Sequence, residues 1–176
     1  MRRKSGFTLV EVLVVIGIIA LLAGMLLGGL NAVRRRARKA NARSAVDQIA
    51  TAWTAYYVDY KHFPDVGPGS SFKLKEMNED AVHILHGNYD LSEYPNHTRY
   101  QEKNPRGTAY MEFHEAHTGG FNDPWGNMYQ LALDEEPYDN EVNAAGESLK
   151  RNVAVWSMGP DGTSGTADDV RSWDKY

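Results

Sequence analysis

The first third of the chain contains a long apolar stretch that is interrupted once. Residues 7–30 are hydrophobic, glycine or threonine except for one acidic side chain, Glu11. As a helix these 24 residues extend about 36 Å, enough to cross a hydrocarbon core of about 30 Å. We therefore predict a membrane-spanning helix. A carboxylate at the centre of a bilayer costs roughly 2.5–3.5 kcal/mol, so Glu11 requires an explanation.

Residues 31–63 change to an amphipathic pattern that predicts a continuation of the same helix. Apolar side chains recur at intervals of three and four, at Val46, Ile49, Trp53, Tyr56 or Tyr57, and Tyr60. This spacing places them on one helical face. The first proline of the chain is Pro64. We therefore expect one helix from Phe7 to about Lys61, with an aromatic stripe along its second half.

Residues 64–176 contain turn and stop signals that predict a small globular head made of short elements. A helix is predicted at 72–87, where Gly87 is a stop signal. A turn followed by a strand is predicted within 121–133, and further strands at 152–158 and 169–173. Residues 65–120 otherwise read as a variable loop with short elements. The expected fold class is α+β, with the long helix packed on a small antiparallel sheet formed within residues 121–176.

Charge divides the chain into a basic stem and an acidic head. Nine of the 19 Lys and Arg residues lie within residues 1–43, where Glu11 is the only acidic residue. The other 133 residues carry ten basic and 22 acidic side chains, a net charge of −12. Such a head argues against nucleic-acid binding, which needs positive charge, and suits a cation or a basic partner. The absence of cysteine excludes disulfides and a thiol nucleophile.

Residues 1–6 form a basic leader that has two interpretations. A cleaved secretory signal is one, but the apolar stretch is longer than the usual 7–15 residues and no small-x-small site ends it cleanly. A membrane anchor is the other. Basic residues stand on both sides of the apolar stretch, within residues 2–4 and 34–43, so charge alone does not fix the orientation.

The junction between leader and apolar stretch resembles a known processing signal. The residues Gly6-Phe7-Thr8-Leu9-Val10-Glu11 are similar to the class III signal of type IV pilins and type II secretion pseudopilins. The resemblance implies that prepilin peptidase cleaves between Gly6 and Phe7 and methylates the new amine of Phe7. It also implies a cytoplasmic leader, a single span in the inner membrane and a periplasmic head.

The resemblance also suggests a physical role for Glu11. An opposite charge offsets the desolvation of a carboxylate in lipid. In a filament of parallel, staggered subunits, Glu11 of one subunit could meet the Phe7 ammonium of its neighbour. The cost of the charge in the membrane would then favour assembly and fix the register. The alternative is a glutamate that only reaches toward the interface.

Two C-terminal segments extend the resemblance. Residues 123–129, DPWGNMY, are similar to a turn of the major pseudopilins of type II secretion. Residues 156–170 contain WSMGPDG and GTADDV, which are similar to their calcium-binding loop. The resemblance implies calcium ligands from three carboxylates and two regions of backbone carbonyls: Asp161, Asp168, Asp169, and the carbonyls near Met158 and Ser164.

The chemistry of this loop leaves two interpretations open. Calcium takes six to eight oxygen ligands at about 2.3–2.6 Å, and three aspartates lie within residues 161–169. Gly159, Gly162 and Gly165 let the backbone turn its carbonyls inward. The spacing is not that of an EF-hand. An Asp/Gly-rich loop between strands is also common as a plain turn.

Other polar clusters give weaker signals. His83 and His86, and likewise His114 and His117, have an i, i+3 spacing that can chelate zinc on a helix, although solvated surface is the default. The run of residues 134–136 is expected to be a solvated turn. The basic residues after the apolar stretch suit anionic headgroups or acidic faces of neighbouring subunits, and we favour the neighbours. No nucleophile elbow appears, so no enzyme is expected.

The sequence therefore predicts a structural subunit of the periplasmic pseudopilus of a type II secretion system. The expected partners are further copies of the chain, prepilin peptidase, the inner-membrane assembly platform and minor pseudopilins. One alternative is a minor pseudopilin, or a subunit of a related type IV pilus or DNA-uptake filament, although pilin heads commonly carry a disulfide loop. A second alternative is an anchored enzyme or binding protein that never polymerises.

Overall fold

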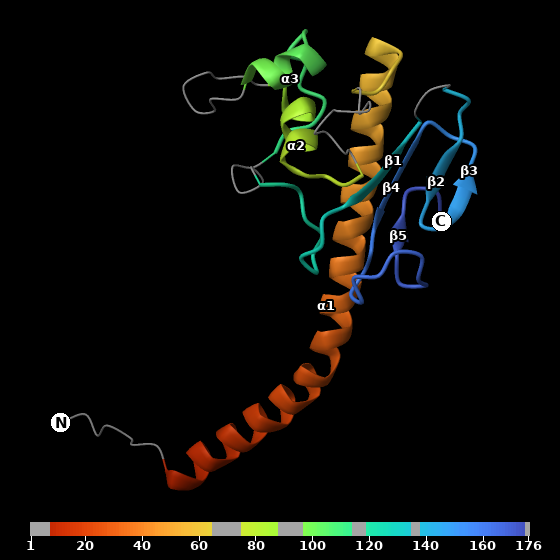
Figure 1. Ribbon diagram of the computed structural model, residues 1–176. Helices are drawn as coiled ribbons and strands as arrows, with labels where there is room; N and C mark the ends of the chain where they lie inside the picture. Colours follow the sequence, from red (N-terminus) through yellow and green to blue (C-terminus); the bar gives the residue numbers. More distant parts are fainter. Residues whose placement is uncertain (1–7, 65–74, 88–96, 114–118, 135–137, 175–176) are drawn as a thin grey trace, which may run out of the picture. The chain divides into compact units, whose positions relative to one another are not determined.

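A computed structural model describes residues 8–64, 75–87, 97–113, 119–134 and 138–174 (Figure 1). The chain divides into two compact units, one up to Arg38 and one from Lys39 onward. Helix α1 (Leu9–Tyr60) contributes residues to both units, so each unit is described by itself. As predicted, α1 runs without a break past the apolar stretch. It ends where Lys61 takes a left-handed backbone conformation with φ of 61°.

In the first unit, α1 exposes its large apolar side chains. Those described from Leu9 to Leu22 are each 49–80% exposed. Covering apolar surface is favourable by roughly 25 cal/mol per Å², so this surface favours an apolar environment. Over the residues that the structure describes, no helix meets the length and hydrophobicity needed to cross a membrane.

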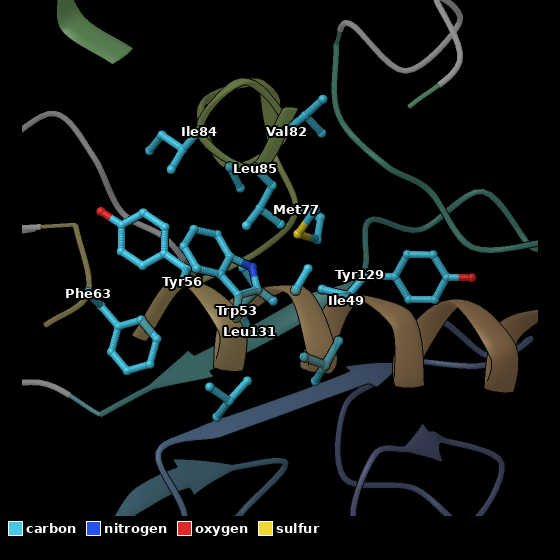
Figure 2. Packing of buried hydrophobic residues seen from close by; sticks show 14 of the residues in the cluster. Ile49, Trp53, Tyr56, Phe63, Met77, Val82, Ile84, Leu85, Tyr129 and Leu131 are labelled. Atoms are coloured by element: carbon cyan, nitrogen blue, oxygen red, sulfur yellow. The ribbon is translucent and has the colours of Figure 1, made fainter. Parts of the chain in front are cut away.

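In the second unit, the amphipathic part of α1 forms the centre of the core. Val46, Ile49, Trp53 and Tyr56 are completely buried, which confirms most of the predicted stripe, whereas Tyr60 is only partly buried. Figure 2 shows how side chains from other parts of the head gather around this stripe. They come from α2 (Glu79–His86), β1 (Gln130–Leu133) and the segments before them.

The main sheet has three antiparallel strands in the order β1-β4-β5. β4 (Val153–Ser157) lies in the middle, with Leu131 of β1 opposite Val155 and with Val170 of β5 (Val170–Arg171) opposite Ser157. All five residues of β4 are buried. Val153 and Val155 join the cluster around α1, whereas Ala154 and Trp156 join a second cluster. Both faces of β4 are therefore covered.

The second cluster is completed by a hairpin that the sequence analysis did not predict. β2 (Val142–Ala144) and β3 (Glu147–Leu149) pair antiparallel across a two-residue turn. The turn residues Ala145 and Gly146 both have positive φ, 50° and 81°, as a type I′ turn requires. The strands have only three residues each, so their alternation is too short to stand out in the sequence. Burial of Val142 and Ala144 against Trp156 stabilises them.

Helix α2 starts later than predicted because Asn78 caps it. The Asn78 side chain accepts a hydrogen bond from the Ala81 N–H at 3.0 Å, which fixes the first turn. Residues 72–74 lie outside the described residues, and Glu76, before the cap, pairs with Gln130 of β1. The predicted end of the helix is correct, since Gly87 takes the left-handed conformation with φ of 66°.

Part of residues 65–120, which the sequence predicted to be a variable loop, completes the core. Helix α3 (His97–Lys103) leads into Asn104, which is fully buried. The Asn104 amide donates to the Ile84 carbonyl at 2.8 Å and to the Thr108 carbonyl at 2.9 Å. Its oxygen accepts a hydrogen bond from the Tyr60 hydroxyl at 2.8 Å. One polar side chain thus joins α1 to the end of α2.

Replacing Trp53 by alanine should lower the free energy of unfolding by about 3–5 kcal/mol, because the change leaves a cavity under both α2 and the sheet. Val58→Ala is the matched control on the same helix, since Val58 is 56% exposed and its truncation should change stability by about 0.5 kcal/mol or less. Urea unfolding of the full-length protein in detergent, followed by circular dichroism, measures both. Equal effects would contradict the assignment of Trp53 to the core.

Candidate functional site

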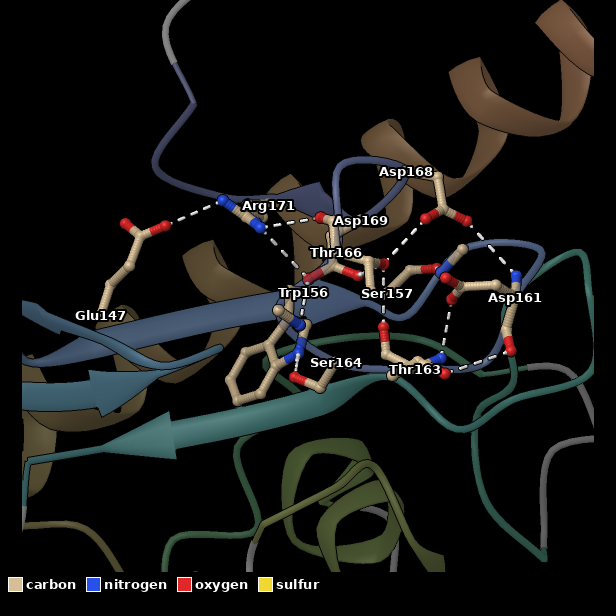
Figure 3. Close-up of polar contacts among 12 residues, drawn as sticks. Glu147, Trp156, Ser157, Asp161, Thr163, Ser164, Thr166, Asp168, Asp169 and Arg171 are labelled. Carbon is tan, nitrogen blue, oxygen red and sulfur yellow. Dashed lines mark hydrogen bonds and ion pairs between the residues drawn. The ribbon is translucent and has the colours of Figure 1, made fainter.

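The loop of residues 158–169 joins β4 to β5 and contains the three aspartates predicted to bind calcium (Figure 3). The Thr166 hydroxyl donates a hydrogen bond to Asp168 Oδ1 at 2.8 Å. The backbone N–H of Asp161 donates to Asp168 Oδ2 at 3.3 Å. The bond from Thr166 lowers the pKa of Asp168, so this carboxylate is charged at neutral pH.

Asp169 is the buried acid of the loop. Its side chain has no exposed surface, and its Oδ2 accepts the Gly165 N–H at 2.8 Å and lies 3.5 Å from Arg171 Nη2. Its Oδ1 lies 3.3 Å from the Thr166 hydroxyl. A buried carboxylate requires such partners, because desolvation disfavours its charge. The shared hydroxyl of Thr166 brings one oxygen of Asp168 and one of Asp169 together.

The other predicted ligands are placed differently. Asp161 is exposed, and its Oδ1 accepts the Thr163 N–H at 2.8 Å. The Ser164 hydroxyl accepts a hydrogen bond from the indole N–H of Trp156 at 2.8 Å. Met158 is half-buried directly after β4, and a ligand role for its carbonyl or that of Ser164 stays a prediction. In the described part of the chain, no three acidic or histidine side chains form a metal-binding group.

The structure couples this loop to the predicted turn of residues 123–129. The Ser157 hydroxyl donates to Asp123 Oδ2 at 2.6 Å and accepts the Gly159 N–H at 3.1 Å. The Asn127 amide donates to the Gly159 carbonyl at 3.2 Å. The other oxygen of Asp123 accepts the N–H groups of Trp125 and Asn127, both at 2.9 Å. The two motifs that the sequence identified separately therefore form one hydrogen-bonded structure.

The donor chemistry of the loop fits calcium. Its carboxylates, hydroxyls and carbonyls supply only hard oxygen donors, the type that calcium prefers. A Cβ built on Gly159 would lie 2.7 Å from both the carbonyl oxygen and Oδ2 of Asp168. These two oxygens therefore pack directly against the Gly159 backbone, where a larger residue would not fit. Arg171 places a positive group beside the buried Asp169, so the loop already accommodates a cation at one carboxylate.

The histidine pairs do not form a metal site in the described residues. His83 is buried rather than solvated, and its ring stacks on Tyr100 with centroids 4.8 Å apart. His86 is partly buried and contacts Phe113 edge-on at 6.4 Å. Each ring therefore contacts an aromatic neighbour. His114 and His117 lie outside the described residues.

Asp134 also differs from the sequence expectation. It was expected in a solvated turn, but only 1% of its surface is exposed. Its Oδ2 accepts the Asn140 N–H at 3.0 Å, and burial raises its pKa. The residue follows β1 directly, and the Asp134 N–H donates to the Asn152 carbonyl at 2.9 Å, which draws it inward. Glu135 and Glu136 lie outside the described residues.

At the N-terminal signal, the structure describes Glu11 but not Gly6 or Phe7. Glu11 closes a capping box with Thr8 at the start of α1. Its Oε2 accepts the N–H and the hydroxyl of Thr8, both at 2.7 Å, while the Glu11 N–H donates to the Thr8 hydroxyl at 3.3 Å. The Thr-x-x-Glu spacing is the sequence signature of this motif, so this role of Thr8 could have been predicted.

Comparisons with known proteins concern the N-terminal signal and the chain as a whole. Residues 1–27 match a family model described as the prokaryotic N-terminal methylation motif. The chain is 29% identical to type II secretion system core protein G of Aeromonas hydrophila, over 98% of this chain and 94% of the relative. It is 29% identical to core protein G of Escherichia coli K12, over 97% and 92% of the two chains. The corresponding protein of Pseudomonas aeruginosa is 26% identical over 98% and 97%.

The chain matches type II secretion core protein G, the major pseudopilin, over nearly its full length. Eight relatives match it in this way, and all carry the description core protein G, which disfavours the pilus and minor-pseudopilin alternatives. No solved structure matches it significantly. The family assignment and the α+β pilin-like fold predicted from the sequence are confirmed, and the pseudopilin is a structural protein rather than an enzyme.

Replacing Gly159 by alanine should destabilise the pseudopilin more than Gly146→Ala does. Both glycines have positive φ, 64° and 81°, so each change costs about 1–2 kcal/mol of backbone strain. At Gly146 a Cβ meets no atom within 4 Å, whereas at Gly159 it meets the backbone of Asp168. Thermal unfolding of the two variants measures the difference. Equal losses would mean that Asp168 is not held against Gly159.

Proposed function

We propose that this chain is the polymerising subunit of a periplasmic pseudopilus and that its assembly drives protein export. The observation that carries this proposal is the near-full-length similarity to core protein G, which includes both the N-terminal signal and the C-terminal loop. In this proposal prepilin peptidase removes residues 1–6 and methylates Phe7. The inner-membrane assembly platform then adds the subunit to the filament, with minor pseudopilins as further partners.

We further propose that residues 7–30 cross the inner membrane once before assembly, with the head in the periplasm. The length and hydrophobicity of this stretch support the proposal. The exposure of its described apolar side chains supports it as well, because lipid or neighbouring helices would cover them. After assembly, helices of other subunits would replace lipid around the same side chains.

Glu11 is proposed to set the register of the filament by pairing with the Phe7 ammonium of a neighbouring subunit. The capping box holds the Glu11 carboxylate beside the first turn of α1, close in sequence to its own N-terminus. The positive end of the helix dipole also stabilises a carboxylate at this position. Before assembly these local hydrogen bonds lower the free-energy cost of desolvating the Glu11 carboxylate. In the filament the neighbour's ammonium would add a full opposite charge beside it.

Glu11→Gln separates these two roles. Glutamine keeps a capping-box acceptor at the same position but removes the charge. We expect the variant to be cleaved and to accumulate like the unmodified chain, yet to lose most pseudopilus assembly and protein export. Chemical cross-linking of the periplasmic filament, immunoblotting and a secretion assay measure these outcomes. Normal assembly of the glutamine variant, with failure of Glu11→Lys alone, would contradict the charge-pair role.

We also propose that the loop of residues 158–169 binds calcium. The carboxylates of Asp161, Asp168 and Asp169 would hold the ion, with backbone carbonyls near Met158 and Ser164. Calcium would supply positive charge that offsets the repulsion of three acids within one loop. The oxygen-only donor set and the close placement of Asp168 and Asp169 on Thr166 support the site. Asp161 would have to turn from Thr163 to join them.

Adding millimolar calcium to the full-length protein in detergent should raise its melting temperature relative to EGTA. Binding at 100 times the dissociation constant adds about 2.7 kcal/mol, on the order of 10 °C for a head of this size. Magnesium should have a smaller effect, because it demands a tighter octahedral site. Asp168→Asn should abolish the shift, whereas the control Asp139→Asn, an exposed acid on another loop, should retain it. An unchanged shift in Asp168→Asn would contradict the assigned ligands.

A further inference from the structure

Arg171 occupies an unusual position between the acidic loop and the hairpin (Figure 3). Its Nη1 lies 2.8 Å from Glu147 Oε1 on β3, and its Nη2 donates to the Thr166 carbonyl at 2.9 Å. The same Nη2 lies 3.5 Å from Oδ2 of the buried Asp169. The Arg171 side chain is 18% exposed, so these charges are partly shielded from water. Among the described residues, Arg171 is the cationic partner of the loop's aspartates through Asp169.

We propose that Arg171 is a built-in cation of the loop, which competes with calcium for Asp169 and thereby weakens the affinity of the site. This inference rests on the proposed calcium site. The affinity of a calcium loop follows the net charge of its ligands, and one positive group beside three carboxylates lowers that charge by a third.

The contacts of Arg171 suit an exchange of partners. The distance to Glu147 is the shorter of its two carboxylate contacts, 2.8 Å against 3.5 Å. Glu147 is itself held by the indole N–H of Trp173 at 3.2 Å, and the guanidinium lies over the Trp173 ring at 5.9 Å. A cation that takes Asp169 would therefore leave Arg171 paired with Glu147. Both Asp169 and Arg171 would then keep an opposite charge beside them.

The same contacts predict that Arg171 stabilises the loop when calcium is scarce. It connects Thr166 and Asp169 to the hairpin, so it joins the loop to a neighbouring element through a charge-assisted contact. The loop has few apolar anchors of its own, and positive charge lowers the repulsion between its acids. The head would then fold without metal, and calcium would add to that stability rather than being required for it.

The test compares calcium affinity by isothermal titration calorimetry in full-length protein purified in detergent. Arg171→Gln should bind calcium about tenfold more tightly, because one opposing unit charge is removed beside the ligands. Arg171→Lys keeps the charge and should stay within about threefold of the unmodified protein. Arg151→Gln is the control, since it removes the same charge just before β4 without touching the loop, and should change affinity by about twofold at most.

A second pair of variants tests whether calcium affinity falls when the loop itself is left unchanged. Glu147→Gln removes the anchor on β3, so that Asp169 becomes the remaining carboxylate beside Arg171, and calcium affinity should fall about threefold. Glu141→Gln, an exposed acid just before β2, is its control and should have a smaller effect. Melting temperatures in EGTA give an independent readout. Arg171→Gln should melt at a lower temperature in EGTA and gain more from calcium than the unmodified protein does.

Three results would overturn the proposal. Equal calcium affinity in Arg171→Gln and the unmodified protein would show that no competition exists, while the calcium site itself would stand. Weaker binding in both Arg171→Gln and Arg171→Lys would assign Arg171 a purely structural role. An absence of calcium binding in every variant would overturn the calcium site and this inference together. The filament function would remain open to its own test at Glu11.

Discussion

The head of this pseudopilin depends on the burial of one helical stripe. The strands of the main sheet have two to five residues, and sheets of this size are not stable alone. Ile49, Trp53 and Tyr56 supply an apolar surface that α2 and β1 cover from different sides (Figure 2). The hairpin β2–β3 closes the opposite face of β4 through Trp156. Each element outside α1 is therefore stabilised mainly by what it packs against.

One continuous helix serves two different environments. Up to Arg38, the described large apolar side chains of α1 are exposed, and in the proposed function lipid or other subunits would cover them. From Lys39 onward the same helix carries small and polar residues on one side and the core stripe on the other. A filament subunit needs this combination. In the proposed function, its first part would exchange lipid for protein during assembly while its head stays folded.

The acidic loop is organised by hydrogen bonds and charge rather than by apolar burial. Ser157 and Asp123 fix where the loop leaves β4, and Thr166 collects oxygens of Asp168 and Asp169. Concentrating negative charge in this way destabilises a fold unless positive charge is nearby. Arg171 provides such charge from the protein itself, and calcium would provide more. If calcium binds as proposed, these two sources of positive charge would let the acidic head fold with or without the ion.

The sequence by itself determined the features that depend on neighbouring residues. The interval of three and four placed Ile49 and Trp53 on one face, Gly87 ended α2, and Gly6 to Glu11 identified the family. Tertiary structure decided the rest. The hairpin is covered by Trp156, and Asp134 is drawn inward by Asn152. The contacts of Ser157 with Asp123 and of Arg171 with Glu147 join residues 34 and 24 positions apart. Strand register sets these distances, and register follows from packing across the whole head rather than from any local pattern.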